Sequence, residues 1–101
     1  MITLHGDLDS LLPIGPNSDR YVELIGRAGR SQWHRFYVVE GGNHVDQLYD
    51  VFPDRLRPIL PCYRAAFVAL ERWVEEKGNQ RPPPSRRIPR SGGDLANHCE
   101  L

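Results

Sequence analysis

The chain has 101 residues, of which 40% are hydrophobic and 26% are charged, so it can form one small domain and is too short for most complete enzymes of the larger folds. Its 13 lysines and arginines balance 13 aspartates and glutamates, so no net charge favours nucleic acid or an anionic membrane surface. No apolar run approaches the about 20 residues of a membrane span, and the first residues lack the pattern of a secretion signal. We therefore expect no nucleic-acid partner and no membrane association.

The first 42 residues predict a strand, a helix and a second strand. Residues 2–5 form a short apolar, β-branched run that Gly6 ends. The polar residues 17–19 predict a helix N-cap, and apolar side chains at helical spacing extend that helix to residue 28. Residues 35–40 are rich in β-branched and aromatic side chains and predict the second strand. A connection of this length makes a right-handed βαβ unit with parallel strands.

The second half of the chain predicts a long loop and one strong helix. Residues 43–60 contain two prolines and are too long for a simple connector. Pro61 suits a first helical turn, and apolar residues then recur at helical spacing to residue 74, with Lys77 on the same face before Gly78. Phe67, Leu70 and Trp73 share this spacing, so we expect all three in the core.

The last residues predict a tail rather than a further folded unit. Residues 80–101 carry three consecutive prolines and four nearby arginines, a composition typical of extended or polyproline chain that is solvated along its length. We therefore divide the chain into a folded segment, 1–79, and a tail, 80–101. The fold class is α/β, in a βαβα order with two parallel strands, and a sheet of two strands is incomplete on its own.

The two cysteines leave two alternatives open. Cys62 and Cys99 are too few for a disulfide scaffold and lack the close Cys or His neighbours of a zinc site. They are either a bridge that holds the tail or two free thiols.

An acidic turn follows the first strand and a histidine follows the second. Asp7 and Asp9 come directly after Gly6, and His44 comes directly after Gly42. Because neighbouring parallel strands end at the same edge of a sheet, these turns should meet there. We expect Asp9 and His44 to lie within about 2.6 to 3.2 Å of each other, since an acid that orients a histidine is the supporting half of a catalytic triad.

These turns resemble the C-terminal part of the α/β-hydrolase superfamily. The pattern His5-Gly6-x-x-Asp9-x-x-x-Pro13 is similar to its strand-to-acid turn, and Gly42-Asn43-His44 is similar to its final histidine loop. Further segments resemble esterases of the tannase and feruloyl-esterase type and 3-hydroxybutyrate-oligomer hydrolases: Ser18-Asp19-Arg20-Tyr21, residues 35–40 leading to Asn43-His44-Val45-Asp46, Pro61-x-x-Arg64-x-Ala66-Phe67, and Pro82-Pro83-Pro84-Ser85 with the arginines that follow.

The resemblance implies a serine-type carboxylic ester hydrolase that acts on a small or oligomeric ester and uses no metal or other cofactor. Asp9 then takes the place of the triad acid and His44 that of the general base. Asp7 is the rival acid, but the spacing of glycine, acid and proline favours Asp9, and we expect Asp7 to bond the backbone of its own turn. Some related esterases are secreted, although this chain shows no signal of its own.

The nucleophile of that family is missing from the chain. Hydrolases of this fold carry their serine in Gly-x-Ser-x-Gly, upstream of the acid and the histidine. None of the serines here has that flanking glycine pair: Ser10, Ser18, Ser31, Ser85 and Ser91. We therefore expect the nucleophile, the oxyanion hole and the remainder of the hydrolase domain to lie upstream, and the chain alone to be inactive. The alternative is a small non-catalytic α/β binding module or a degenerate, truncated hydrolase.

The other polar candidates predict structural roles. His5 ends a strand and should bond backbone, and His34 should lie in an exposed turn. Asp46 suits a turn or a helix cap better than a metal site, because only His44 stands near it.

Overall fold

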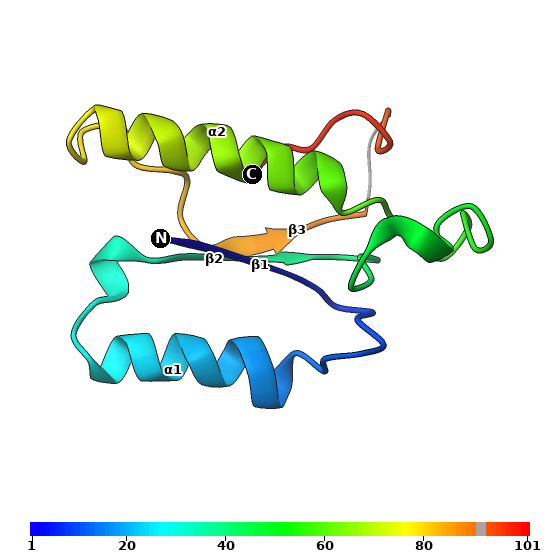
Figure 1. Cartoon of the computed structure of the whole chain (residues 1–101), viewed down its shortest axis with the longest axis horizontal. Coiled ribbons are helices and arrows are strands. Elements are labelled where there is room, and N and C mark those ends of the chain that lie inside the picture. The colour runs from blue at the N-terminus through cyan, green and yellow to red at the C-terminus, as the bar shows by residue number, and fades with distance from the viewer. Residues whose placement is uncertain (91–92) are drawn as a thin grey trace.

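A three-stranded parallel sheet lies between two helices in the computed structural model, which describes residues 1–90 and 93–101 (Figure 1). The main elements are β1 (Ile2–Gly6), α1 (Arg20–Arg27), β2 (Arg35–Val39), α2 (Leu60–Glu75) and β3 (Arg86–Ile88). Three short helical turns lie between them: η1 (Gly15–Asp19), η2 (Ser31–Trp33) and η3 (Asp46–Leu48). The helices α1 and α2 cover opposite faces of the sheet. The predicted α/β character is confirmed, and so is the parallel pairing of the first two strands.

A third strand corrects the prediction of two. In the segment predicted as tail, β3 pairs with β2 in parallel, with Tyr37 opposite Arg86 and Val39 opposite Ile88. Ile88 is fully buried in the core, whereas its two arginine neighbours in β3 are exposed. A strand of three residues with one buried side chain has no alternation to detect, so only its partner strand identifies it.

The core gathers around the centre of the sheet and the first turns of α2. Its buried members are Tyr37, Val39, Ile59, Cys62, Ile88 and Cys99. The two cysteines form a disulfide across 37 positions of sequence, which resolves the open alternative in favour of a bridge. The C-terminal segment is therefore tied to α2 by a covalent bond as well as by β3.

Two predictions about α2 and its neighbours are wrong. Phe67 is 69% exposed, not part of the core, because the face of α2 turned to the sheet carries Cys62, Ala66 and Trp73. His34 is only 5% exposed, although an exposed turn was expected. Its Nε2 forms a 2.9 Å hydrogen bond with the Thr3 hydroxyl on β1, a contact that depends on the pairing of two distant strands.

The start of α1 also differs from the expected N-cap. The π turn η1 runs directly into α1, Asp19 has helical backbone angles, and its side chain makes no capping hydrogen bond. The Asn17 amide instead donates to the carbonyl of Pro13 at 2.7 Å. The amides at the start of α1 donate to backbone carbonyls of the preceding turn, that of Asp19 to Ile14 and that of Arg20 to Asn17 and Gly15. These carbonyls take the place of a capping side chain.

Asp46 caps α2 from outside that helix, as the sequence suggested. Its carboxylate accepts hydrogen bonds from the backbone amides of Ile59 at 2.6 Å and Leu60 at 2.9 Å. We expect Asp46→Ala to lower the free energy of unfolding by about 1 to 2 kcal/mol, since two amides at a helix start lose their acceptor. Chemical denaturation measures this loss. The exposed Asp50 is the matched control, and an equal loss in Asp50→Ala would show that the cap contributes nothing specific.

His34 should make stability fall in mild acid. Burial lowers the pKa of His34, and the positive charges of the N-terminus and Arg35 lower it further. The unfolded chain therefore takes up a proton below about pH 6.5 that the folded chain resists, so the free energy of unfolding decreases as the pH falls through that range. Urea titrations at several pH values measure this dependence. In His34→Gln, the free energy of unfolding should depend less steeply on pH than in the wild type. The exposed His98 serves as the control, and the same weakening in His98→Gln would contradict this assignment.

Candidate active site

The carboxyl ends of β1 and β2 meet at one edge of the sheet because two glycines touch there. Gly6 pairs with Val39 at the end of the ladder. A Cβ atom placed on Gly6 would lie 2.2 Å from the carbonyl oxygen of Gly42, so no larger residue fits without moving the backbone. The amide of Leu8 donates to the same carbonyl at 2.9 Å. The turn after β1, which carries Asp9, is called the acid turn, and the turn after β2, which carries His44, is called the histidine turn. The two turns are thus joined by a backbone hydrogen bond.

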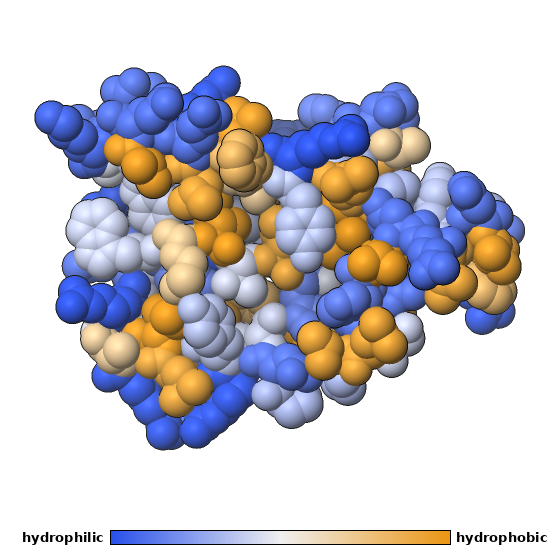
Figure 2. All heavy atoms as spheres, viewed as in Figure 1, coloured by the Kyte–Doolittle hydropathy of each residue, from blue (hydrophilic) through white to orange (hydrophobic). Residues whose placement is uncertain are grey.

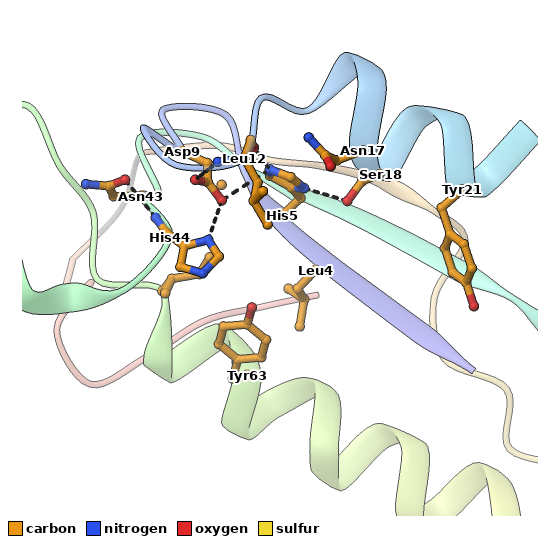
Figure 3. A pocket seen from close by; sticks show the side chains of 12 residues that line it. Leu4, His5, Asp9, Leu12, Asn17, Ser18, Tyr21, Asn43, His44 and Tyr63 are labelled. Atoms are coloured by element: carbon orange, nitrogen blue, oxygen red, sulfur yellow. Dashed lines mark hydrogen bonds and ion pairs between the residues drawn. The ribbon is translucent and has the colours of Figure 1, made fainter.

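This contact places Asp9 and His44 in a hydrogen-bonded pair (Figure 3). Nδ1 of His44 lies 2.9 Å from Oδ2 of Asp9, which confirms the predicted separation. The other carboxylate oxygen, Oδ1, accepts hydrogen bonds from the amides of Leu11 at 2.9 Å and Leu12 at 2.8 Å. Asp9 is therefore held by its own turn on one side and directed at the imidazole on the other.

The surroundings of Asp9 favour its ionised form. Burial alone would raise the pKa of Asp9, but the hydrogen bonds from Leu12, His44 and Leu11 outweigh it and bring that pKa below its ordinary value. A carboxylate accepts hydrogen bonds and cannot donate, so the proton between the pair sits on Nδ1 of His44. The lone pair of the neutral imidazole is then on Nε2, which no group within residues 1–90 and 93–101 engages in a hydrogen bond.

A pocket of about 330 Å³ opens beside this pair. It is lined by the two members of the pair, by Leu12 of the turn that carries Asp9, and by side chains from β1, η1, α1 and α2, among them Leu4, His5, Ser18, Tyr21 and Tyr63. The His44 side chain is 38% exposed, whereas that of Asp9 is 6% exposed. The imidazole is thus reachable from the pocket while the carboxylate behind it is shielded from water.

The carboxylate of Asp7 has different hydrogen-bond partners from those expected. Its Oδ1 accepts a hydrogen bond from the amide of Gly41 at 2.7 Å, and its Oδ2 pairs with the guanidinium of Arg87 at 2.7 Å. The expectation that Asp7 bonds its own turn is therefore wrong. Its carboxylate links the ends of β1, β2 and β3, while Asp9 is the acid that bonds His44.

Asn43 of the histidine loop has a structural role that its sequence pattern does not predict. Its side-chain oxygen accepts hydrogen bonds from the backbone amide of Ser10 at 3.0 Å, the Ser10 hydroxyl at 3.2 Å and the amide of His44 at 2.7 Å. Asn43 is buried and connects the two turns, because its side-chain oxygen bonds the backbone of both. Its position between Gly42 and His44 is the one signal in the sequence that could have indicated this role.

His5 bonds backbone, as predicted, and also approaches the acid. Its Nε2 lies 2.8 Å from the carbonyl oxygen of Leu12 and 3.3 Å from Oδ2 of Asp9. Its Nδ1 lies 2.5 Å from the hydroxyl of Ser18. No local pattern predicts Ser18 at this position, because η1 comes to lie against the end of β1 only in the tertiary structure.

The described residues form neither a metal centre nor a membrane span. Within 1–90 and 93–101, no three His, Cys, Asp or Glu side chains come together in a way that could hold a metal ion. In the same part of the chain, no helix is both long and apolar enough to cross a bilayer. Ser91, one of the serines without flanking glycines, lies outside the described residues.

Comparison with known proteins adds no relative. No family model, no curated protein and no solved structure matches this chain. The chemical content of the site therefore comes from its geometry: a shielded carboxylate that fixes the tautomer of an accessible imidazole, whose free nitrogen borders a pocket.

Proposed function

We propose that this chain is the C-terminal part of a serine-type carboxylic ester hydrolase with an α/β-hydrolase fold. The observation that carries the proposal is the Asp9–His44 hydrogen bond at the carboxyl ends of two adjacent parallel strands. This is the arrangement in which a triad acid supports a general base. The proposed substrate is a small or oligomeric carboxylic ester, in line with the resemblance to feruloyl, tannin and 3-hydroxybutyrate esterases.

The proposed reaction needs a serine from an upstream segment. Its hydroxyl oxygen attacks the ester carbonyl while Nε2 of His44 takes up the hydroxyl proton. Asp9 stabilises the imidazolium that forms, and His44 then gives the proton to the departing alkoxide. In the second half, water attacks the acyl-serine and His44 again accepts the proton. His44 then returns that proton to the serine oxygen as the acyl–oxygen bond breaks, which releases the free acid and restores the serine hydroxyl.

The remainder of the proposed domain would cover surfaces that are open in this chain. β1 is an edge strand of the sheet, so the backbone groups on its outer side have no neighbouring strand among the described residues. Phe67 and Val74 on α2 are 69% and 70% exposed, and apolar side chains are visible at several places on the face shown in Figure 2. Exposed apolar side chains of this size favour contact with further protein.

One pair of expression experiments tests the proposal. The 101-residue chain alone should not hydrolyse an activated nitrophenyl ester above the buffer rate, because the pair has no nucleophile to activate. The chain joined to its contiguous upstream coding segment should hydrolyse the ester and lose this activity to a serine-directed organophosphate. Organophosphate-sensitive turnover by the chain alone would reject the proposed division of the triad. An upstream segment without Gly-x-Ser-x-Gly, or an inactive joined protein, would favour a non-catalytic module.

A further inference from the structure

His5 occupies a position in which it can control the acid turn. It is the fourth residue of β1 and is only 7% exposed, so the sheet fixes its backbone and the surrounding protein fixes its ring. Both ring nitrogens are in contact with other groups. Nδ1 meets the Ser18 hydroxyl of η1, and Nε2 meets the carbonyl of Leu12 at the far end of the acid turn.

The partners of His5 determine where its proton lies. A backbone carbonyl only accepts hydrogen bonds, so the 2.8 Å contact with Leu12 requires a proton on Nε2. Nδ1 of the neutral ring is then an acceptor, and the Ser18 hydroxyl donates to it. Ser18 thereby holds His5 in the tautomer whose N–H points at the acid turn.

The same N–H lies close to the carboxylate. Nε2 of His5 is 3.3 Å from Oδ2 of Asp9, the oxygen that bonds Nδ1 of His44 at 2.9 Å. Leu12 is bound twice: its amide donates to Oδ1 of Asp9, and its carbonyl accepts from His5. The turn that carries Asp9 is thus closed by its own amides and anchored to β1 through His5.

We propose that His5, held in one tautomer by Ser18, is a positioning residue that keeps the Asp9 carboxylate directed at His44. This inference rests on the proposed function for its catalytic meaning, whereas the positioning itself is a property of the chain. His5 acts through Asp9, and Ser18 acts through His5.

Without the imidazole, the carbonyl of Leu12 loses its partner and Asp9 loses the nearby N–H dipole. The turn from Asp9 to Leu12 is then free to move relative to β1. Oδ2 should sample positions away from His44, which weakens the hydrogen bond that fixes the tautomer of the base. The consequence is a less well-directed acid rather than an unfolded sheet.

Nuclear magnetic resonance of the labelled, disulfide-bonded 101-residue chain tests this proposal. Two signals report on the pair: the low-field Nδ1–H proton of His44 and the acid titration of the Asp9 carboxyl carbon. His5→Leu fills a similar volume without a donor, and His5→Gln keeps an N–H that can reach Leu12. His98→Gln, in an exposed part of the chain, is the matched control.

In His5→Leu, we expect the His44 Nδ1–H resonance to be lost through exchange broadening and the pKa of Asp9 to rise toward its ordinary value. His5→Gln should restore the resonance in part, and His98→Gln should leave both signals unchanged. Retention of both wild-type signals in a folded His5→Leu would overturn the proposal. If circular dichroism shows that His5→Leu is unfolded, Ser18→Ala becomes decisive: it should weaken the same resonance, and unchanged signals there would overturn the proposal.

The outcome is separable from that of the proposed function. An inactive joined protein would reject the esterase and leave the positioning result as measured. Conversely, unchanged signals in the His5 and Ser18 variants would reject the positioning role without affecting an active esterase.

Discussion

Replacing His44 by alanine in the proposed joined esterase should lower kcat by about 10⁴-fold, with little change in the folded structure. The imidazole lies at the edge of a pocket and is not part of the core, so its loss should remove the proposed general base and leave the sheet intact. Asp9→Asn should have an effect of similar size, because an amide no longer fixes the proton on Nδ1 of His44. Steady-state kinetics on an activated ester measure both effects.

Asp7→Asn is the matched comparison for Asp9→Asn. Asp7 bonds the amide of Gly41 and the guanidinium of Arg87, so its replacement should weaken these contacts between neighbouring strands. It should lower kcat much less than Asp9→Asn does. The kcat of each variant should be calculated per folded molecule, with the folded fraction determined by circular dichroism. A large loss in Asp7→Asn together with a mild one in Asp9→Asn would reverse the assignment of the acid.

Loss of the Cys62–Cys99 disulfide should lower the free energy of unfolding by about 3 to 4 kcal/mol. The bridge closes a loop across 37 positions of sequence, which includes most of α2, the proline run and β3. Opening it restores the conformational freedom of that loop in the unfolded chain. The free energy of unfolding of a small domain is of similar size to this loss, so a large part of the protein should unfold.

Denaturation of the Cys62→Ala/Cys99→Ala double variant against the oxidised wild type measures this effect. The reduced wild type is the control for side-chain packing, because it keeps both sulfur atoms in the core without the covalent link. Both forms should be destabilised. Unfolding curves that coincide for the oxidised and reduced wild type would show that the bridge does not constrain the unfolded chain.

The amino-acid sequence by itself determined the two strands of the site and the pair that follows them. Residues 2–5 and 35–40 are apolar and β-branched, and each run ends at glycine, so local pattern was enough to predict them. The parallel pairing followed from the length of the connection, and it required that Asp9 and His44 share one edge. The observed 2.9 Å contact confirms that geometry, while the catalytic role of the pair stays a prediction.

Only the tertiary structure decided which partner each polar group takes. Asp7 bonds Arg87 across 80 positions of sequence, and His34 is buried against Thr3 of a neighbouring strand. Neither contact has a local pattern, because each depends on strands that pair through the backbone and leave no mark of the pairing in the side chains.

The C-terminal segment illustrates the same limit. Its prolines and arginines predicted an extended, solvated tail, and most of its composition fits that description. One buried isoleucine and one cysteine nevertheless bring it into the core, Ile88 beside Val39 and Cys99 bonded to Cys62. Composition reports the average environment of a segment, whereas its place in the fold was decided by these two side chains and by the free edge of β2 that receives β3.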